Sequence, residues 1–243
     1  KNQFIMKQIA GKRFLITGAT SGMGKAIAES FLENGMKGIL IGRNKQVLNE
    51  FQSKFSHSEI HTLCVDLKNK DQLYSIPQFI LENNLKIDFL VHSAGFFDMC
   101  PITETTDEML EDSFNINFKV PFILTRELIP NLASSKGQFI FINSTSASLY
   151  KANKAIYSSF KAALKMFAET LFHEVNSMGI KVTTIYPGRV ATPMQQSIRS
   201  LEKLPYKPEE YMSVNSLAAM VLKLITLPQD VEIRHLTLRP PLK

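Results

Sequence analysis

The sequence predicts an α/β fold in which helices cover both faces of one mostly parallel sheet. Seven short apolar runs, rich in branched side chains, recur along the 243 residues, and segments with a helical pattern fill most of the gaps between them. Strands that alternate with helices in this way form parallel sheets whose two faces are covered. No linker, internal repeat or low-complexity segment interrupts the rhythm. Residues 1–243 are therefore expected to form a single, doubly wound domain.

The predicted strands are short buried runs that follow one another along the chain: 12–17, 38–42, 61–65, 88–92, 138–143, 181–186 and 234–238. The first reads "KRFLIT" and leads through glycine-rich sequence into a helical pattern that ends at Asn34-Gly35, a usual place for a helix to stop. Two longer helices are expected around 107–133 and 155–178. Residues 192–212, before the last helix, have no clear pattern.

The composition is that of an ordinary globular protein, with 44% hydrophobic and 21% charged residues. No apolar run approaches the roughly 18 residues of a membrane span, and the first residues show no signal-peptide pattern. Cys64 and Cys100 form neither a disulfide framework nor a metal-ligand spacing, so we expect a cytoplasmic protein without a metal. The formal charge of +6 is spread along the chain, which argues against nucleic-acid binding.

A cluster of glycines follows the first predicted strand in "ITGATSGMGKAIAESF". Gly18, Gly22 and Gly24 allow a tight turn and a close backbone approach to a phosphate group. The helix that opens near Gly22 directs its free N–H groups and the positive end of its dipole at the same place. Between a buried strand and an amphipathic helix, this cluster predicts a nucleotide-binding loop.

The spacing T-G-x-x-x-G-x-G, taken together with "YSSFK" at 157–161, resembles the short-chain dehydrogenase/reductase family over essentially the full length. The resemblance implies a Rossmann-type fold and an NAD(P)-dependent oxidoreductase that interconverts a carbonyl and a secondary alcohol by hydride transfer. It implies that the cofactor is contacted by Thr17, Gly18, Ser21, Gly22, Met23, Gly24, Asp66, Ala94, Gly95, Tyr157, Lys161, Pro187, Gly188, Val190 and Thr192. It also implies catalytic roles for Asn117, Ser144, Tyr157 and Lys161.

Two tyrosines have a lysine four residues later, which places both side chains on one helix face. Tyr157 precedes Lys161 in a long amphipathic helical segment, whereas Tyr150 precedes Lys154 in a polar connection. Thirteen residues before Tyr157 lies Ser144, at the end of the "QFIFIN" strand, where open α/β sheets bind ligands. Tyr157 is therefore the candidate.

The chemistry expected of this group is proton transfer to or from a carbonyl oxygen. A free tyrosine has a pKa of about 10, and we expect Lys161, with the positive charge of an oxidised nicotinamide, to lower it. Ser144 would hydrogen-bond the same oxygen, although Thr145, Ser146 and Ser148 are rivals for this role. Asn117 would relay protons through water. The alternative for Asn117 is a buried asparagine satisfied by backbone.

The residues after the second strand favour NADP(H) over NAD(H). An acid at the strand end would bind the ribose hydroxyls of NAD, but the sequence reads "GILIGRNK", with Gly42 in that place and Arg43 after it. A guanidinium suits a 2′-phosphate. Alternatively, Arg43 is only a solvated residue at the start of a loop. Ser21 stands where many NADP-preferring relatives of the family carry a second basic group.

Other positions leave alternatives open. His92-Ser93 replaces the two asparagines usual in the family's fourth-strand motif, and the chain ends in "LRPPLK" where many members are glycine-rich. His92 is expected to be a hydrogen-bonded structural group. Asp66 either contacts adenine, as the resemblance implies, or caps the next helix.

The substrate is a small carbonyl or alcohol compound whose class stays open: an apolar ketone, a 3-oxo ester or acyl chain, or a sugar. Phe96, Phe97 and Met99 are expected to supply an apolar wall, and 192–212 a lid over the pocket. A non-catalytic, dinucleotide-binding regulatory protein on the same fold is the alternative function.

We also expect a homodimer or homotetramer, because the two long helices carry more apolar side chains than one sheet face can cover. These are Leu110, Phe114, Phe118, Phe122, Phe167 and Phe172. The resemblance implies pairing through these helices.

Overall fold

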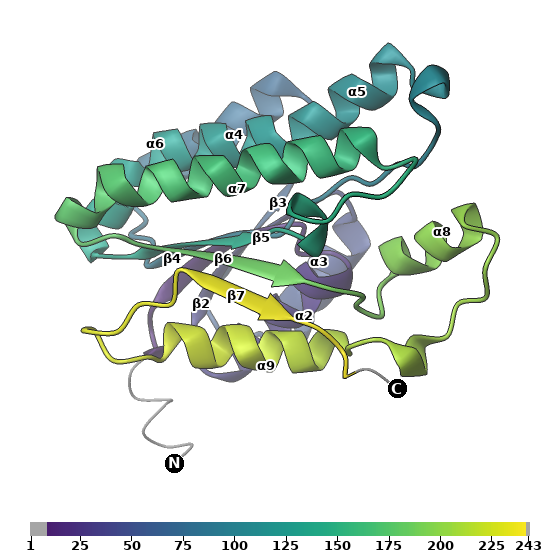
Figure 1. The fold of residues 1–243 in the computed structure, drawn as a ribbon. Helices are drawn as coiled ribbons and strands as arrows, with labels where there is room; N and C mark the ends of the chain where they lie inside the picture. Colours follow the sequence, from purple (N-terminus) through teal and green to yellow (C-terminus); the bar gives the residue numbers. More distant parts are fainter. Residues whose placement is uncertain (1–8, 242–243) are drawn as a thin grey trace.

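The computed structural model describes residues 9–241 and contains one seven-stranded sheet (Figure 1). Every pairing between neighbouring strands is parallel, and their order is β3-β2-β1-β4-β5-β6-β7. The strand bounds are β1 Arg13–Thr17, β2 Lys37–Gly42, β3 Ile60–Cys64, β4 Phe89–His92, β5 Gln138–Ile142, β6 Lys181–Pro187 and β7 His235–Leu238. This confirms the predicted doubly wound, Rossmann-type fold. The direction of winding reverses between β1 and β4, where such sheets bind ligands.

Helices form a layer on each face of the sheet (Figure 1). One layer consists of α2 Gly22–Glu33, α3 Lys45–Lys54 and α9 Val214–Ile225. The other consists of α4 Lys70–Glu82, α5 Asp107–Phe114, α6 Val120–Ser135 and α7 Ala155–Val175. No helix within residues 9–241 is both long and apolar enough to cross a membrane.

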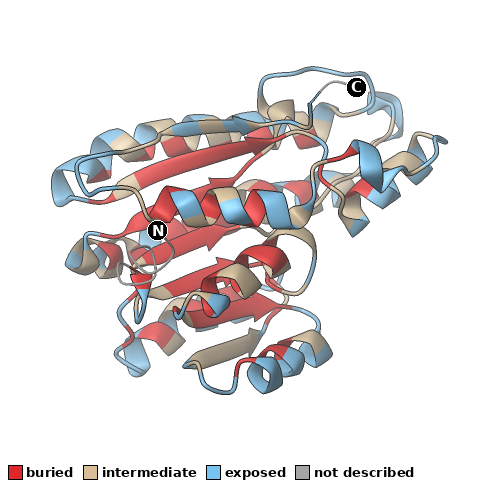
Figure 2. Ribbon diagram, turned by 90° about the horizontal axis from the view of Figure 1, so that it is seen from below, coloured by how far each residue is buried: buried red, intermediate tan, exposed pale blue. Residues whose placement is uncertain are grey.

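The five inner strands of the sheet contribute side chains to two separate cores, because successive residues point to opposite faces. In β1, Phe14 and Ile16 join the core under α2 and α9, and Leu15 joins the core under α6 and α7. Figure 2 shows buried residues concentrated in the strands and on the helix faces turned toward them. Burial on both faces explains why the strands read as continuous apolar runs and not as alternating ones.

The helix expected over 107–133 differs from the prediction in its middle. The chain forms α5, then a π-helical turn at Asn115–Lys119, and then α6. Such a turn inserts one residue into the helix and is frequent at functional sites. The apolar periodicity continues through it, so the pattern alone could not reveal it.

The stretch 192–212 is also more regular than its pattern suggested. It contains α8 Pro193–Leu201 and a 3₁₀ turn at Pro208–Glu210. Thr192 caps α8 by accepting a hydrogen bond from the Gln195 N–H at 3.1 Å, and Pro193 occupies the first turn. Both residues are standard signals for a helix start. In Figure 1 this helix projects beyond the carboxyl ends of the strands.

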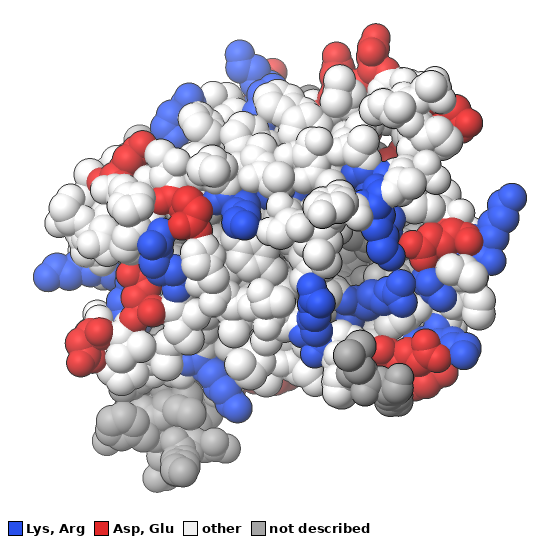
Figure 3. Space-filling view, in the orientation of Figure 1, with Lys and Arg blue, Asp and Glu red and all other residues white. Residues whose placement is uncertain are grey.

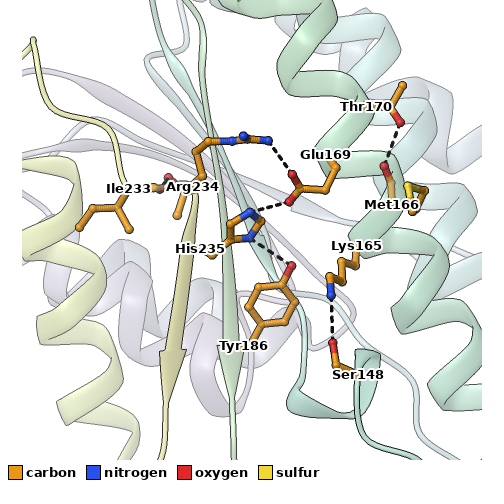
Figure 4. Close-up of polar contacts among 10 residues, drawn as sticks. Ser148, Lys165, Met166, Glu169, Thr170, Tyr186, Ile233, Arg234 and His235 are labelled. Carbon is orange, nitrogen blue, oxygen red and sulfur yellow. Dashed lines mark hydrogen bonds and ion pairs between the residues drawn. The ribbon is translucent and has the colours of Figure 1, made fainter.

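The edge strand β7 is tied to α7 by a polar cluster (Figure 4). Glu169 of α7 accepts from Arg234 at 2.5 Å, and its other oxygen lies 2.7 Å from the His235 Nε2 atom. The other ring nitrogen of His235 lies 3.5 Å from the Tyr186 hydroxyl on β6. The far end of β7 in turn accepts a 2.7 Å hydrogen bond from Gly188 to the Leu238 carbonyl. These contacts fix the segment that follows β6, where predicted site residues lie.

Candidate active site

In the turn between β1 and α2, the backbone packs so closely that only glycine fits at positions 18 and 24. Gly18 and Gly22 have φ of +72° and +52°, in the left-handed region. A Cβ on Gly18 would lie 2.9 Å from the Ala94 backbone, and one on Gly24 would lie 2.3 Å from the Gly18 carbonyl oxygen. No side chains therefore cover the backbone of this loop at Gly18 and Gly24, where it approaches the end of β4.

The amino end of α2 leaves donors free at the same place. Ser21 occupies the N-cap position, but its side chain makes no capping hydrogen bond, and the first turn contains no acid. The first N–H groups of a helix have no partner within the helix and attract anions. Bare backbone and free N–H groups together fit the pyrophosphate of a dinucleotide.

A cavity of about 260 Å³ adjoins this loop. Ten of the predicted cofactor contacts line it: Gly18, Ser21, Gly22, Met23, Gly24, Arg43, Asp66, Ala94, Gly95 and Thr192. Thr17 is buried beneath the loop, where its hydroxyl accepts hydrogen bonds from the Ser93 and Ala94 N–H groups, both at 3.2 Å. It holds the end of β4 against β1 and does not itself line the cavity.

Asp66 follows β3 and does not cap α4. The cap is Asn69, whose side chain accepts from the Gln72 N–H at 3.0 Å. Asp66 instead accepts from the Lys68 N–H at 3.1 Å and donates its own N–H to the Gln72 side chain at 2.8 Å. The alternative of a capping role is therefore wrong, and Asp66 lies in the cavity wall.

Sequence reasoning missed the part that Thr20 plays beside Gly42. A Cβ on Gly42 would lie 2.4 Å from the Thr20 Cγ2 atom. Thr20 thus fills the space into which a side chain at the end of β2 would project. Arg43, the next residue, is exposed and lines the cavity. Its side chain makes no ion pair with any residue in 9–241.

A second cavity, of about 220 Å³, lies at the carboxyl ends of β5 and β6. Its walls include Ser144, Tyr157, Pro187, Gly188 and Val190, and it shares Met23, Thr192 and Met194 with the first cavity. Of the predicted apolar wall, Phe97 lines this cavity and Phe96 lines the first; Met99 lines neither. The two cavities meet where the carboxyl edge of the sheet passes under α8.

Ser144 and Tyr157 both line this second cavity. Ser144 begins a 3₁₀ turn after β5, and its hydroxyl accepts from the Ser146 N–H at 3.1 Å. Tyr157, in the first turn of α7, is 9% exposed and meets the Phe97 ring edge to face at 4.8 Å. Tyr150 is 95% exposed and lines neither cavity. The two tyrosines thus differ sharply in surroundings.

Lys161 lies one turn below Tyr157 and is 3% exposed. Its ammonium is 5.8 Å from the centre of the Tyr157 ring and donates to the Ile142 carbonyl at 3.4 Å. No carboxylate among residues 9–241 forms an ion pair with it. Burial without a counter-charge lowers the pKa of Lys161 to about 8.

The pKa of Tyr157 departs from the sequence-based expectation. Burial raises it above its ordinary value, and the nearby Ser144 hydroxyl offsets part of that rise. In the protein alone, the cost of desolvating a phenolate therefore dominates. A further positive charge at this cavity would be needed to bring the pKa down.

Asn117 lies in the π-helical turn and is fully buried. Its side chain donates to the Phe96 carbonyl at 2.8 Å and to Ser113 at 3.0 Å, and its Oδ1 atom accepts from the Phe96 N–H at 3.2 Å. It therefore holds the segment after β4 against the helix layer. These contacts are the ones expected of a buried asparagine that is satisfied by backbone, which was the alternative to a proton relay.

His92 is buried at the end of β4, where its Nε2 atom lies 3.0 Å from the Thr125 hydroxyl. The ring stacks on Phe141 at 4.8 Å, and burial lowers the pKa of His92 to about 3. No group of three or more potential metal ligands lies close together in the described range. His92, Thr17 and Asn117 therefore hold the end of β4 and the segment after it against their neighbours. This role was expected of the asparagines that are usual in the family at this place.

Comparison with known proteins agrees with this geometry. The family model described as short chain dehydrogenase matches residues 12–203. An uncharacterized oxidoreductase of Staphylococcus aureus is 28% identical over 236 residues, covering 97% of this chain and all of the relative. An uncharacterized oxidoreductase of Staphylococcus epidermidis matches with the same identity and coverage.

Solved structures are similar as well. L-sorbose reductase from Gluconobacter frateurii, complexed with NADPH and L-sorbose, has a TM-score of 0.85 at 26% identity, over 96% of each chain. The closed form of a serine dehydrogenase complexed with NADP⁺ has a TM-score of 0.83 at 25% identity, over 94% of each chain. The chain belongs to the short-chain dehydrogenase/reductase family of NAD(P)-binding oxidoreductases, and it is a dehydrogenase or reductase that acts on CH–OH or C=O groups.

Proposed function

We propose that the protein is an NADP(H)-dependent oxidoreductase that interconverts a carbonyl and a secondary alcohol, with Tyr157 as general acid and base. The observation that carries this proposal is that Ser144 and Tyr157 line one cavity, while the buried ammonium of Lys161 lies 5.8 Å from the centre of the Tyr157 ring. A protein that only binds a dinucleotide has no use for all three groups. The cavity of the glycine loop opens beside them.

The residues of the first cavity would hold the dinucleotide. The free N–H groups of α2 and the bare loop at Gly18 and Gly24 suit its pyrophosphate. Asp66 lies at the far end, for adenine, and Pro187 to Thr192 border the second cavity, for the nicotinamide. When bound, the nicotinamide supplies or accepts a hydride at the carbonyl carbon.

Proton transfer falls to the chain itself. In reduction, the Tyr157 hydroxyl donates its proton to the carbonyl oxygen, and Ser144 donates a hydrogen bond that holds the same oxygen. Lys161, whose pKa is about 8, carries a proton at neutral pH and stabilises the phenolate left behind. Because burial raises the pKa of Tyr157, the positive charge of the oxidised nicotinamide is needed for the reverse step.

The role of Asn117 as a proton relay stays a prediction. Its side-chain atoms are committed to Phe96 and Ser113, so a relay would have to leave these bonds intact. Asn117→Ala separates the two roles: a relay predicts slow turnover with a solvent isotope effect, whereas a purely structural role predicts lower stability and an unchanged isotope effect.

Preference for NADP(H) rests on Arg43 and on the space above Gly42. Because Thr20 fills that space, the acid that favours NAD has no room in this chain. The exposed Arg43 guanidinium, free of ion pairs within residues 9–241, is available for a 2′-phosphate. The similar L-sorbose reductase and serine dehydrogenase structures are complexes with NADPH and NADP⁺, which supports the same choice.

We also propose a cytoplasmic homodimer or homotetramer. Leu110, Phe114 and Phe122, on α5 and α6, are 38–45% exposed, and Met166 of α7 is 67% exposed. Phe118, Phe122 and Phe167 contact one another, so these helices present one joined aromatic face. A second copy would cover it. A monomeric mass by light scattering at micromolar concentration would contradict this.

The function is tested by absorbance at 340 nm with NADPH and a panel of ketones, oxo esters, oxo acids and sugars. We expect at least one compound to be reduced, with NADPH consumed in equal amount. The alternative, a regulatory dinucleotide-binding protein, predicts tight NADPH binding by fluorescence and no turnover with any compound.

A further inference from the structure

The second cavity has an excess of positive charge that the proposed function does not explain. Four charged side chains line it, namely Lys151, Lys154, Arg189 and Glu202. The remaining walls are polar or apolar, and the cations near the nucleotide loop, Arg43 and Lys68, belong to the other cavity. Three cations thus face one carboxylate.

That single carboxylate is already neutralised. Glu202, just after α8, lies 3.2 Å from the Lys154 ammonium and 2.9 Å from the Arg199 guanidinium. Burial alone would raise the pKa of Glu202, but hydrogen bonds from these two cations outweigh it and keep the pKa below its usual range. Lys154 is therefore already paired with Glu202, and its ammonium also lies over the Phe97 ring, 5.3 Å from the ring centre.

Lys151 and Arg189 remain without a partner. Both are exposed, and neither side chain makes a hydrogen bond or ion pair within residues 9–241. The backbone of Arg189 is fixed, since its carbonyl accepts from the Met212 N–H at 3.1 Å. Arg239, also exposed and unpaired in the described range, lies beside Gly188, where a Cβ would be 3.3 Å from its Cγ atom. Figure 3 shows Lys and Arg side chains bordering the hollow next to α8.

We propose that the substrate carries a carboxylate, which Arg189 binds at the cavity mouth with Lys151 beside it, while its alcohol or ketone carbon lies at Tyr157. This inference rests on the proposed function. A guanidinium binds a carboxylate through two parallel hydrogen bonds. Like charges collected at one cavity also repel one another and draw an anion toward it.

The size of the cavity limits how large the rest of the substrate can be. At about 220 Å³ it is below the 300 to 1,000 Å³ usual for drug-sized ligands. Phe97, Met194 and Ile198 give it an apolar side that suits a short carbon chain. The geometry therefore favours a short hydroxy acid and its oxo acid over a sterol or a long acyl chain. In oxidation, the hydride passes from the carbinol carbon to NADP⁺ and the hydroxyl proton leaves through Tyr157.

The experiment compares acids with their neutral esters. Hydroxy acids of four to six carbons, with the hydroxyl at carbon 2, 3 or 4, and their methyl esters are oxidised with NADP⁺ at 340 nm. We expect at least one acid to exceed its ester about tenfold in kcat/KM, the worth of a charged hydrogen bond. Arg189→Gln should lower that ratio about tenfold and Lys151→Gln less, whereas Arg189→Lys should keep part of it.

Lys165→Gln is the matched control. Lys165 projects from α7, donates to Ser148 at 3.0 Å and lies outside this cavity, so the ratio should not change. Esters oxidised as well as every acid, or a ratio unaffected by Arg189→Gln, would overturn the inference and leave the proposed function standing. Turnover of neither acids, esters nor neutral ketones would overturn both.

Discussion

The two cavities of this protein are built from different materials. The cavity at the glycine loop is shaped by backbone: Gly18 and Gly24 approach other backbone atoms so closely that a methyl group has no room. The neighbouring cavity at Tyr157 is shaped by side chains from the η3 turn Thr145–Ala147, α7 and α8, and the segments between these elements add the exposed charges of Lys151 and Arg189. Backbone-built sites tolerate little change, whereas side-chain-built sites can be altered one contact at a time.

This difference has a functional meaning. A dinucleotide presents the same phosphates to every enzyme that uses it, so a rigid backbone cradle suits it. A substrate differs from one enzyme to the next, and its specificity is expected to lie in exchangeable side chains such as Arg189 and Lys151.

The largest effect is expected in the backbone-built cavity. Gly24→Ala should lower the free energy of unfolding by about 3 kcal/mol, because the new Cβ would lie 2.3 Å from the Gly18 carbonyl oxygen. Gly95→Ala is the matched control: its Cβ would meet atoms only at 3.7 Å, so the loss should stay below about 1 kcal/mol. Denaturant unfolding measures both. Equal losses would mean that close packing of the loop is not what restricts it.

Side chains at the edge of the same cavity should matter for selectivity and little for stability. NADP(H) should be preferred over NAD(H) by about 1–3 kcal/mol in kcat/KM, and Arg43→Ala should erase most of this while NAD(H) kinetics hardly change. Lys45→Ala, two residues on and outside the cavity, should keep the preference. Equal kcat/KM for the two dinucleotides in the unaltered protein would contradict the assignment.

His92, buried at the end of β4, predicts a pH-dependent stability. Its pKa is about 3 in the folded protein and about 6.5 when unfolded, so the unfolded chain binds more protons between these values. The stabilising contribution is present above pH 6.5 and is lost as the pH falls. About 2 kcal/mol of it should disappear by pH 5.

Asparagine, the family's usual residue at this position, provides the test. His92→Asn should flatten the slope of unfolding free energy against pH between 5 and 7, as measured by denaturant midpoints. An unchanged slope in this variant would show that His92 does not stay neutral in the folded state.

The smallest effect is expected at α8, in the segment 192–212 that was predicted to form a lid. Glu202→Gln removes the ion pairs that join the end of α8 to Lys154 at the start of α7, and should speed amide hydrogen exchange in 193–201 by several-fold, equivalent to about 1 kcal/mol. Glu210→Gln breaks only the pair with Lys207, in which both side chains are half exposed, and should change nothing. Identical exchange in the two variants would show that the Glu202–Lys154 ion pair does not hold α8 in place.

The fold followed from the sequence almost completely. The predicted strands 12–17 and 234–238 differ from β1 and β7 by one residue at the start, although β7 is only partly buried at the edge of the sheet. The π-helical turn could not be predicted, since it depends on Asn117 reaching the Phe96 backbone from another segment. The start of α8 was signalled by Thr192-Pro193 and was missed because the charges that follow hide an apolar face.

The site was predictable where it depends on motifs and not where it depends on packing. Glycine spacing located the nucleotide loop, and the distance from Ser144 distinguished Tyr157 from Tyr150. No pattern in the sequence could show that Thr20 fills the space above Gly42, that burial raises the pKa of Tyr157, or that Glu202 neutralises Lys154. These are contacts between residues far apart in the chain.

The central claim is that Tyr157 transfers the proton, and one comparison tests it most directly. Tyr157→Phe and Tyr150→Phe each remove one hydroxyl, the first buried beside Ser144 and the second 95% exposed. With NADPH and any ketone that the unaltered enzyme reduces, kcat should fall by at least about 100-fold in Tyr157→Phe while NADPH still binds. In Tyr150→Phe it should remain within about twofold. Near-normal turnover in Tyr157→Phe, together with an inactive Tyr150→Phe, would contradict the account.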